Sequence, residues 1–125
     1  MGIDVFEHVE DFRGFLRAMR PRATWKLFHI PHDLSVQTIL RGRGVMYARE
    51  RLGHIHFFYK DSALMTLPDC VYEIVDWSYT HAAETLPSRA LRTRLLNVPR
   101  KLLRVFGEDF SVRVTGGSSM MVLAR

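Results

Sequence analysis

Hydrophobic residues recur at helical spacing near the start of the chain. Between residues 3 and 19 the apolar positions are separated by steps of four, three, four and three, which places them on one face of a helix. Asp4 and Glu7 have the spacing of a capping box, and Pro21 follows the pattern, so we expect a helix over residues 3–19. The apolar face consists of Val5, Val9, Phe12, Leu16 and Met19.

A second helical pattern runs from Ser88 to Phe106. Pro99 lies inside it and predicts a kink, and Gly107 is suited to the C-terminal cap. A further helix is predicted over residues 70–84, and a short one over residues 35–41 with Asp33 or Ser35 as the N-cap. The apolar face of the 88–106 pattern consists of Leu91, Leu95, Val98, Leu102 and Phe106.

Five stretches have the composition of β-strands. Residues Thr24–Ile30 predict one strand, which offers a route to a homodimer if it lies at a sheet edge. Residues Val45–Arg49 and His54–Lys60 predict a hairpin that turns at Gly53. A closing hairpin is predicted from Phe110–Thr115 and Met120–Ala124.

These elements follow one another in the order α-β-α-β-β-α-α-β-β. That order predicts an α+β fold: a two-layer sandwich with amphipathic helices packed on an antiparallel or mixed sheet. A length of 125 residues is typical of one domain with one core, so we expect a single domain over residues 1–125.

Composition favours a globular protein that folds without a disulfide, metal or cofactor. Apolar residues make up 47% of the chain and charged residues 25%, which is ordinary globular usage. Cys70 is the only cysteine, and we expect it to be a small buried hydrophobe in a reducing compartment. The N-terminal residues do not resemble a secretory signal, and no apolar run is long enough for a membrane span, so we expect a cytoplasmic protein.

Basic residues are concentrated late in the chain. The formal net charge is +5, and residues 86–106 contain six basic side chains and no acid. Such a face suits phosphates or an acidic protein surface, so nucleic acid or an acidic protein is the expected partner; the alternative is a solvated outer face. The expected contacts are Arg89, Arg92, Arg94, Arg100, Lys101 and Arg104.

Two aromatic stretches, 26–30 (KLFHI) and 53–59 (GHIHFFY), resemble the two short motifs of RNA-recognition-motif domains. In that family, aromatic side chains on neighbouring strands stack against bases. The resemblance implies a platform made by Phe28, His54 and His56, whereas the alternative is that these aromatics belong to the core.

His54 and His56 flank one apolar residue, which would place both imidazoles on one face of a strand. Nucleases of the rolling-circle replication type use such a pair to hold a metal while a helical tyrosine attacks the phosphodiester. The resemblance implies Tyr72 or Tyr79 as the nucleophile. Two ordinary half-buried histidines are the alternative, and adding His29 and His32 gives no recognisable zinc spacing.

The sequence is therefore consistent with three functions. A non-enzymatic domain that binds nucleic acid or another polyanion is placed first. A small-molecule-sensing or protein-interaction domain of a regulatory system is the alternative, and a metal-dependent single-strand nuclease is third. The glycine pairs match no phosphate-binding loop.

Overall fold

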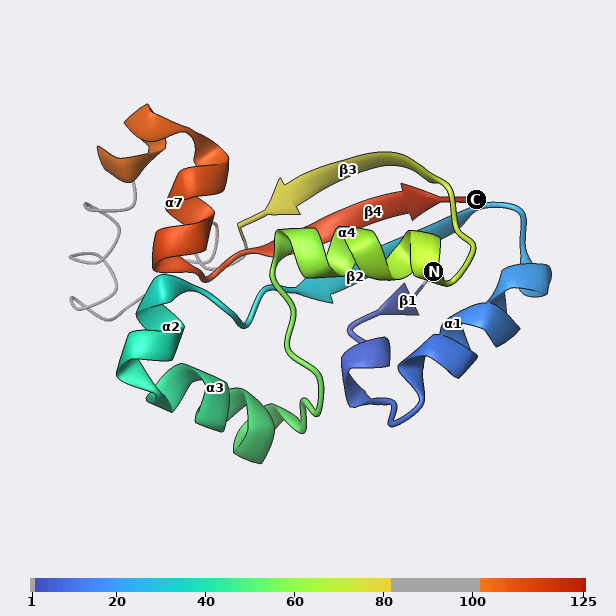
Figure 1. Ribbon diagram of the computed structural model, residues 1–125, viewed down its shortest axis with the longest axis horizontal. Helices are drawn as coiled ribbons and strands as arrows, with labels where there is room; N and C mark the ends of the chain where they lie inside the picture. Colours follow the sequence, from blue (N-terminus) through green and yellow to red (C-terminus); the bar gives the residue numbers. More distant parts are fainter. Residues whose placement is uncertain (1, 82–101) are drawn as a thin grey trace.

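A four-stranded mixed sheet lies at the centre of the fold (Figure 1). The computed structural model describes residues 2–81 and 102–125 of the chain. The strand order is β1-β2-β4-β3, in which β1 is parallel to β2 and β4 is antiparallel to both of its neighbours. Val122 of β4 is paired with Phe28 of β2 on one side and Trp77 of β3 on the other. The strands are β1 (Gly2–Ile3), β2 (Lys26–Pro31), β3 (Ile74–Thr80) and β4 (Ser119–Ala124).

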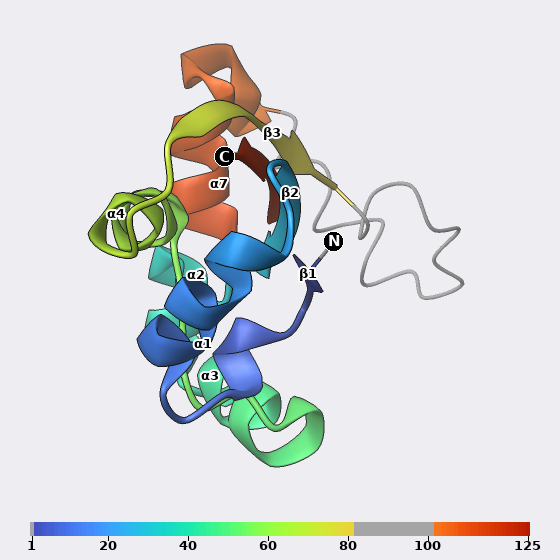
Figure 2. The ribbon, with the colours of Figure 1, turned by 90° about the vertical axis from the view of Figure 1, so that its right-hand side faces the viewer.

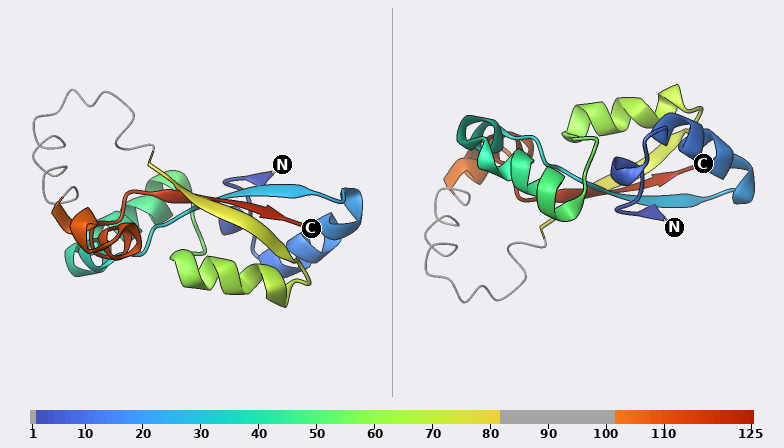
Figure 3. Two further views of the ribbon diagram at one scale, coloured as in Figure 1. Left: turned by 90° about the horizontal axis from the view of Figure 1, so that it is seen from above. Right: turned by 90° about the horizontal axis from the view of Figure 1, so that it is seen from below.

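Helices cover one face and one end of this sheet. Helices α1 and α4 lie on the same face, while α2, α3 and α7 gather at the end where β2 finishes (Figures 1, 2 and 3). This arrangement confirms the predicted α+β fold. The helices are α1 (Phe12–Met19), α2 (Val36–Arg41), α3 (Arg43–Tyr47), α4 (Lys60–Asp69) and α7 (Glu108–Thr115), with single turns η1 (Phe6–His8), η2 (Arg20–Arg22), η3 (Ala48–Leu52) and η4 (Arg104–Phe106).

The core lies between the sheet and helices α1 and α4. The Phe6 ring meets Phe28 and Phe58 edge to face, with ring centroids 6.2 and 5.2 Å apart, a favourable aromatic geometry. The Tyr72 hydroxyl donates a buried hydrogen bond of 2.7 Å to the Leu16 carbonyl, which ties the segment before β3 to α1. Other buried members are Ile30, Ala63, Leu67, Cys70, Met120, Val122 and Ala124; the predicted burial of Cys70 is thereby confirmed.

Several local predictions are confirmed. The strand expected over residues 24–30 is β2, and Met120–Ala124 is contained in β4. Ser35 caps α2: its hydroxyl accepts from the Thr38 amide at 3.1 Å, while the Thr38 hydroxyl accepts from the Ser35 amide at 2.7 Å. These caps satisfy amides that a helix leaves unpaired at its first turn.

The predicted helix over residues 3–19 is wrong in its first half. Gly2 and Ile3 form a strand instead, and α1 begins at Phe12 because the Asp11 carboxylate caps the Gly14 amide at 2.9 Å. Asp4 bonds His29 at 2.7 Å rather than closing a capping box with Glu7.

The predicted hairpin over residues 45–60 is also wrong. Val45 lies in α3, and the chain continues through the π-helical turn η3 to Gly53, which has φ +78° and ends that turn. The following segment forms no strand. The amides of Ile55 and His56 donate to the Glu7 carbonyl at 2.9 and 3.1 Å, so their partner is the η1 segment rather than a neighbouring strand.

Two later elements exchange their predicted types. Residues 74–80, predicted as part of a helix, form strand β3, and residues 110–115, predicted as a strand, form most of α7. Pairing with β4 makes residues 74–80 a strand. In α7, an i,i+4 ion pair of 2.7 Å joins Asp109 to Arg113, a spacing that favours a helix.

Strand β2 lies inside the sheet between β1 and β4, so the edge position suggested as a homodimer route is wrong. Across the parts of the chain at 2–81 and 102–125, the helices all fall short of the length and hydropathy that crossing a bilayer requires.

Candidate functional site

Most of the predicted basic face lies outside the described residues. Arg89, Arg92, Arg94, Arg100 and Lys101 all fall within 82–101, whereas Arg104 begins η4 and is half-buried. Leu102 and Phe106, predicted to face the core, are 64% and 76% exposed, so that part of the prediction is wrong.

The predicted aromatic platform is wrong in its geometry. Phe28 points into the core and is only 2% exposed, because its β2 register places it beside Val122 on the helix-covered face. His54 and His56 are not on a strand. His54 is buried beside Asp33, and the His56 Nε2 atom lies 3.0 Å from the Val9 carbonyl.

The predicted helical tyrosine is also wrong, because neither tyrosine lies on a helix. Tyr72 precedes β3 and is buried, and Tyr79 lies on β3, where its hydroxyl donates to Asp109 at 2.5 Å. Partial burial and the Asp109 carboxylate raise the pKa of Tyr79 above its ordinary value. A tyrosine held in its protonated form is a poor nucleophile.

The four histidines considered together from the sequence do not converge on one point. His29 contacts Asp4 and Thr80, and His32 is buried. His54 instead lies beside His8 and Glu7, and ligand atoms of these three residues all fall within 4.8 Å of one another. The adjacent Glu7-His8 pair in the sequence was the available signal for this cluster. The sequence pattern assigns Glu7 only to the predicted capping box with Asp4.

A basic cleft of about 620 Å³ is lined by residues from the end of α1, the start of β2 and the end of β4. Arg17 comes from the last turn of α1 and Arg20 from η2, where the chain turns to enter β2. Lys26 begins β2, and Arg125 follows β4 at the C-terminal end. The remaining lining residues are Pro21, Ala23, Thr24, Val71 and Glu73.

Among the residues that the structure describes, Glu73 is the only acid that lines this cleft, and it is already neutralised. The Arg125 guanidinium donates to both Glu73 carboxylate oxygens, at 2.9 and 3.0 Å. These hydrogen bonds lower the pKa of Glu73 and raise that of Arg125. Four cationic side chains against one carboxylate leave a net charge of about +3 in the cleft.

One feature of the cleft and one feature beside it suit an anionic ligand. Among the residues that the structure describes, Arg20 forms no ion pair, and Arg17 makes only a long 3.5 Å contact with the Asp69 carbonyl. Trp25 is 52% exposed, and the Arg125 guanidinium lies 5.9 Å from its ring centroid. An exposed indole beside an arginine resembles a stacking surface for a planar group.

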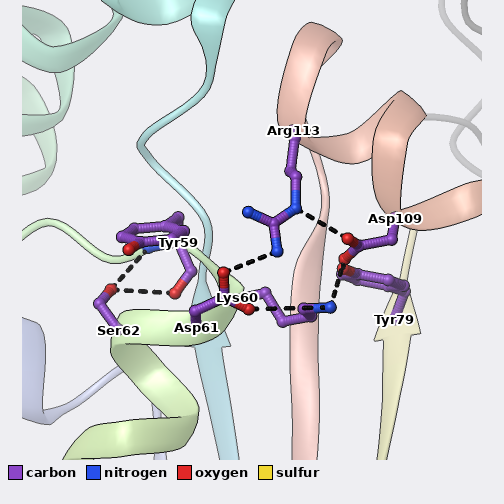
Figure 4. Close-up of polar contacts among 7 residues, drawn as sticks. All are labelled: Tyr59, Lys60, Asp61, Ser62, Tyr79, Asp109 and Arg113. Carbon is purple, nitrogen blue, oxygen red and sulfur yellow. Dashed lines mark hydrogen bonds and ion pairs between the residues drawn. The ribbon is translucent and has the colours of Figure 1, made fainter.

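A second polar network joins the start of α4 to β3 and α7 (Figure 4). Asp109 accepts from Lys60 at 2.6 Å, from Tyr79 at 2.5 Å and from Arg113 at 2.7 Å. Partial burial would raise the pKa of Asp109, but these three hydrogen bonds outweigh it and hold the pKa below its usual range. Arg113 also contacts Asp61 at 2.6 Å. Every charge here has a partner, which indicates a structural link between elements.

Comparison with known proteins gives no further information about these sites. The chain matches no protein-family model, and no curated protein has a similar sequence.

Proposed function

We propose that the protein binds nucleic acid, and single strands in particular, with the basic cleft as one contact surface. The observation that carries the proposal is the cleft lined by Arg17, Arg20, Lys26 and Arg125, in which Glu73 is already paired. Guanidinium groups bind phosphate in a bidentate geometry. Trp25 beside Arg125 offers a face for an unpaired base, which a duplex does not expose.

The test is fluorescence anisotropy with labelled single-stranded DNA and RNA at about 50 and 200 mM salt. If Arg17 and Arg20 each contact one phosphate, release of counterions should weaken single-strand binding about 7-fold over this range. Trp25 fluorescence should fall as a base stacks on the indole. No binding at the lower salt would overturn the proposal.

A double variant locates the surface. Arg17→Glu with Arg20→Glu should abolish binding, because two phosphate contacts become repulsive. The matched control is Arg49→Glu with Arg51→Glu, which makes the same change of charge at two exposed positions of η3. Equal losses in both variants would show that net charge alone is responsible and would remove the cleft from the proposal. The predicted face at residues 86–106 is tested separately by Arg92, Arg100 and Arg104 to Glu.

The protein-interaction alternative has a separate basis. Val36 and Ile39 of α2 are 50% and 63% exposed, and both line an apolar groove together with Tyr59. Such patches are common at protein interfaces. Absence of nucleic-acid binding together with capture of a protein partner that an Ile39→Glu variant loses would favour this function.

A further inference from the structure

The Glu7 carboxylate is buried and has no hydrogen-bonding partner within residues 2–81 and 102–125. It lies in η1 and is 0% exposed. Among the described residues neither of its carboxylate oxygens accepts a hydrogen bond. Burying an unpaired carboxylate is costly, so buried acids are normally paired or coordinate a metal ion. The side chain therefore requires a cation or a proton in the space that it faces.

Two imidazoles lie at this carboxylate. The ligand atoms of Glu7, His8 and His54 all lie within 4.8 Å of one another, and the His8 Nε2 atom is 3.9 Å from Glu7 Oε1. Tetrahedral coordination with metal–ligand bonds near 2.1 Å places ligand atoms about 3.4 Å apart. Small side-chain adjustments would therefore close the three groups around one ion.

Hydrogen bonds at the opposite ring nitrogens leave both Nε2 atoms available as ligands. His8 Nδ1 lies 3.1 Å from the Gly53 carbonyl, which can only accept, so Nδ1 carries the proton. His54 Nδ1 donates in the same way to the Asp33 carboxylate at 2.7 Å. A carboxylate or carbonyl behind a histidine is the usual outer shell of a metal ligand, because it fixes the tautomer and the ring orientation.

The backbone brings these segments together before any ion binds. The Ile55 and His56 amides both donate to the Glu7 carbonyl, and the His54 amide donates to Ala48 at 3.0 Å. Gly53 has a φ of +78°, a backbone conformation that would be strained in a residue with a side chain. The turn at this glycine places the Gly53 carbonyl against His8. The site is therefore held by main-chain contacts rather than by chance proximity of long side chains.

We propose that Glu7, His8 and His54 bind a divalent transition-metal ion of the zinc type, with Asp33 positioning His54. Two imidazoles and one carboxylate form a three-ligand set that leaves a fourth position for water or a substrate group. His8 is exposed whereas Glu7 and His54 are buried, so the open position is on the His8 side. The proposal is independent of nucleic-acid binding.

The test is titration of the chelator-treated protein with Zn²⁺ against a chromophoric chelator, and with Co²⁺ while its visible absorption is followed. We expect one equivalent to bind, and Co²⁺ to show the intense bands of tetrahedral coordination. His8→Ala, at an exposed position that should not disturb folding, and Glu7→Gln, close to isosteric, should each weaken binding about 100-fold. Asp33→Asn should weaken it about 10-fold to 100-fold and shift the Co²⁺ spectrum.

The matched control is His29→Ala. His29 is also paired with an aspartate, at 2.7 Å, but lies outside the cluster. This variant should bind zinc like the unaltered protein. No stoichiometric binding of either metal would overturn the proposal, as would affinity that persists in His8→Ala and Glu7→Gln or that is lost equally in His29→Ala.

Discussion

The unaltered protein should lose stability in mild acid because His32 resists protonation in the folded state. Replacing His32 by phenylalanine should remove this part of the loss. His32 is 5% exposed, and among the described residues neither ring nitrogen has a hydrogen-bonding partner. Burial lowers the pKa of His32 to about 4, with nearby His29 and Lys60 adding to the effect and Asp109 opposing it. The His32 ring also meets Tyr79 edge to face at 5.7 Å, a contact that phenylalanine can keep.

The sign and size of the effect follow from proton linkage. The unfolded chain protonates this histidine near pH 6.5, whereas the folded protein does so only near pH 4. Between these values the unfolded state binds more protons, so the free energy of unfolding falls as the pH falls. The full loss is about 3 kcal/mol, and about 2 kcal/mol of it occurs between pH 7 and pH 5.

The assay is urea unfolding of both proteins at pH 7 and pH 5, followed by the fluorescence of Trp25 and Trp77. Other titrating groups are shared, so the difference between the two proteins isolates His32. At pH 7 the variant should be about as stable as the unaltered protein, because a shape-matched apolar ring replaces unpaired nitrogens. Parallel losses of stability in the two proteins between pH 7 and pH 5 would refute the reasoning.

Two further predictions concern the links between elements. Ser35→Ala should lower the free energy of unfolding by about 1 kcal/mol, because α2 loses the cap on the Thr38 amide; Ser35→Asp, which can still accept that bond, is the control, and an equal loss in both would contradict the capping role. Asp109→Asn should cost about 1 kcal/mol, since the carboxylate that joins Lys60, Tyr79 and Arg113 is 41% exposed and partly screened by solvent. Thermal unfolding at low and high salt measures this second loss, which should shrink as salt is added; a loss that does not change with salt would contradict an ionic origin.

The sequence by itself determined features that depend on neighbours along the chain. Ser35 and Thr38 determine where α2 begins, since a capping box needs only residues three apart. The aromatic and apolar composition of Thr24–Ile30 predicts the strand that the structure places at Lys26–Pro31. The α+β class followed from such local patterns.

Only the tertiary structure decided the elements whose patterns suit both helix and strand. Residues 74–80 are a strand because β4 supplies the hydrogen bonds, and residues 108–115 are a helix although their apolar positions alternate. Propensity is a weak prior that such pairing overrides.

The candidate sites depend on the tertiary structure for the same reason. Arg17 and Arg125 line one cleft only because α1 leads through η2 into the start of β2, which is paired with the end of β4. Glu7, His8 and His54 meet because the Glu7 carbonyl accepts hydrogen bonds from the segment after Gly53. No short-range pattern encodes such convergence, because it results from how distant segments pack.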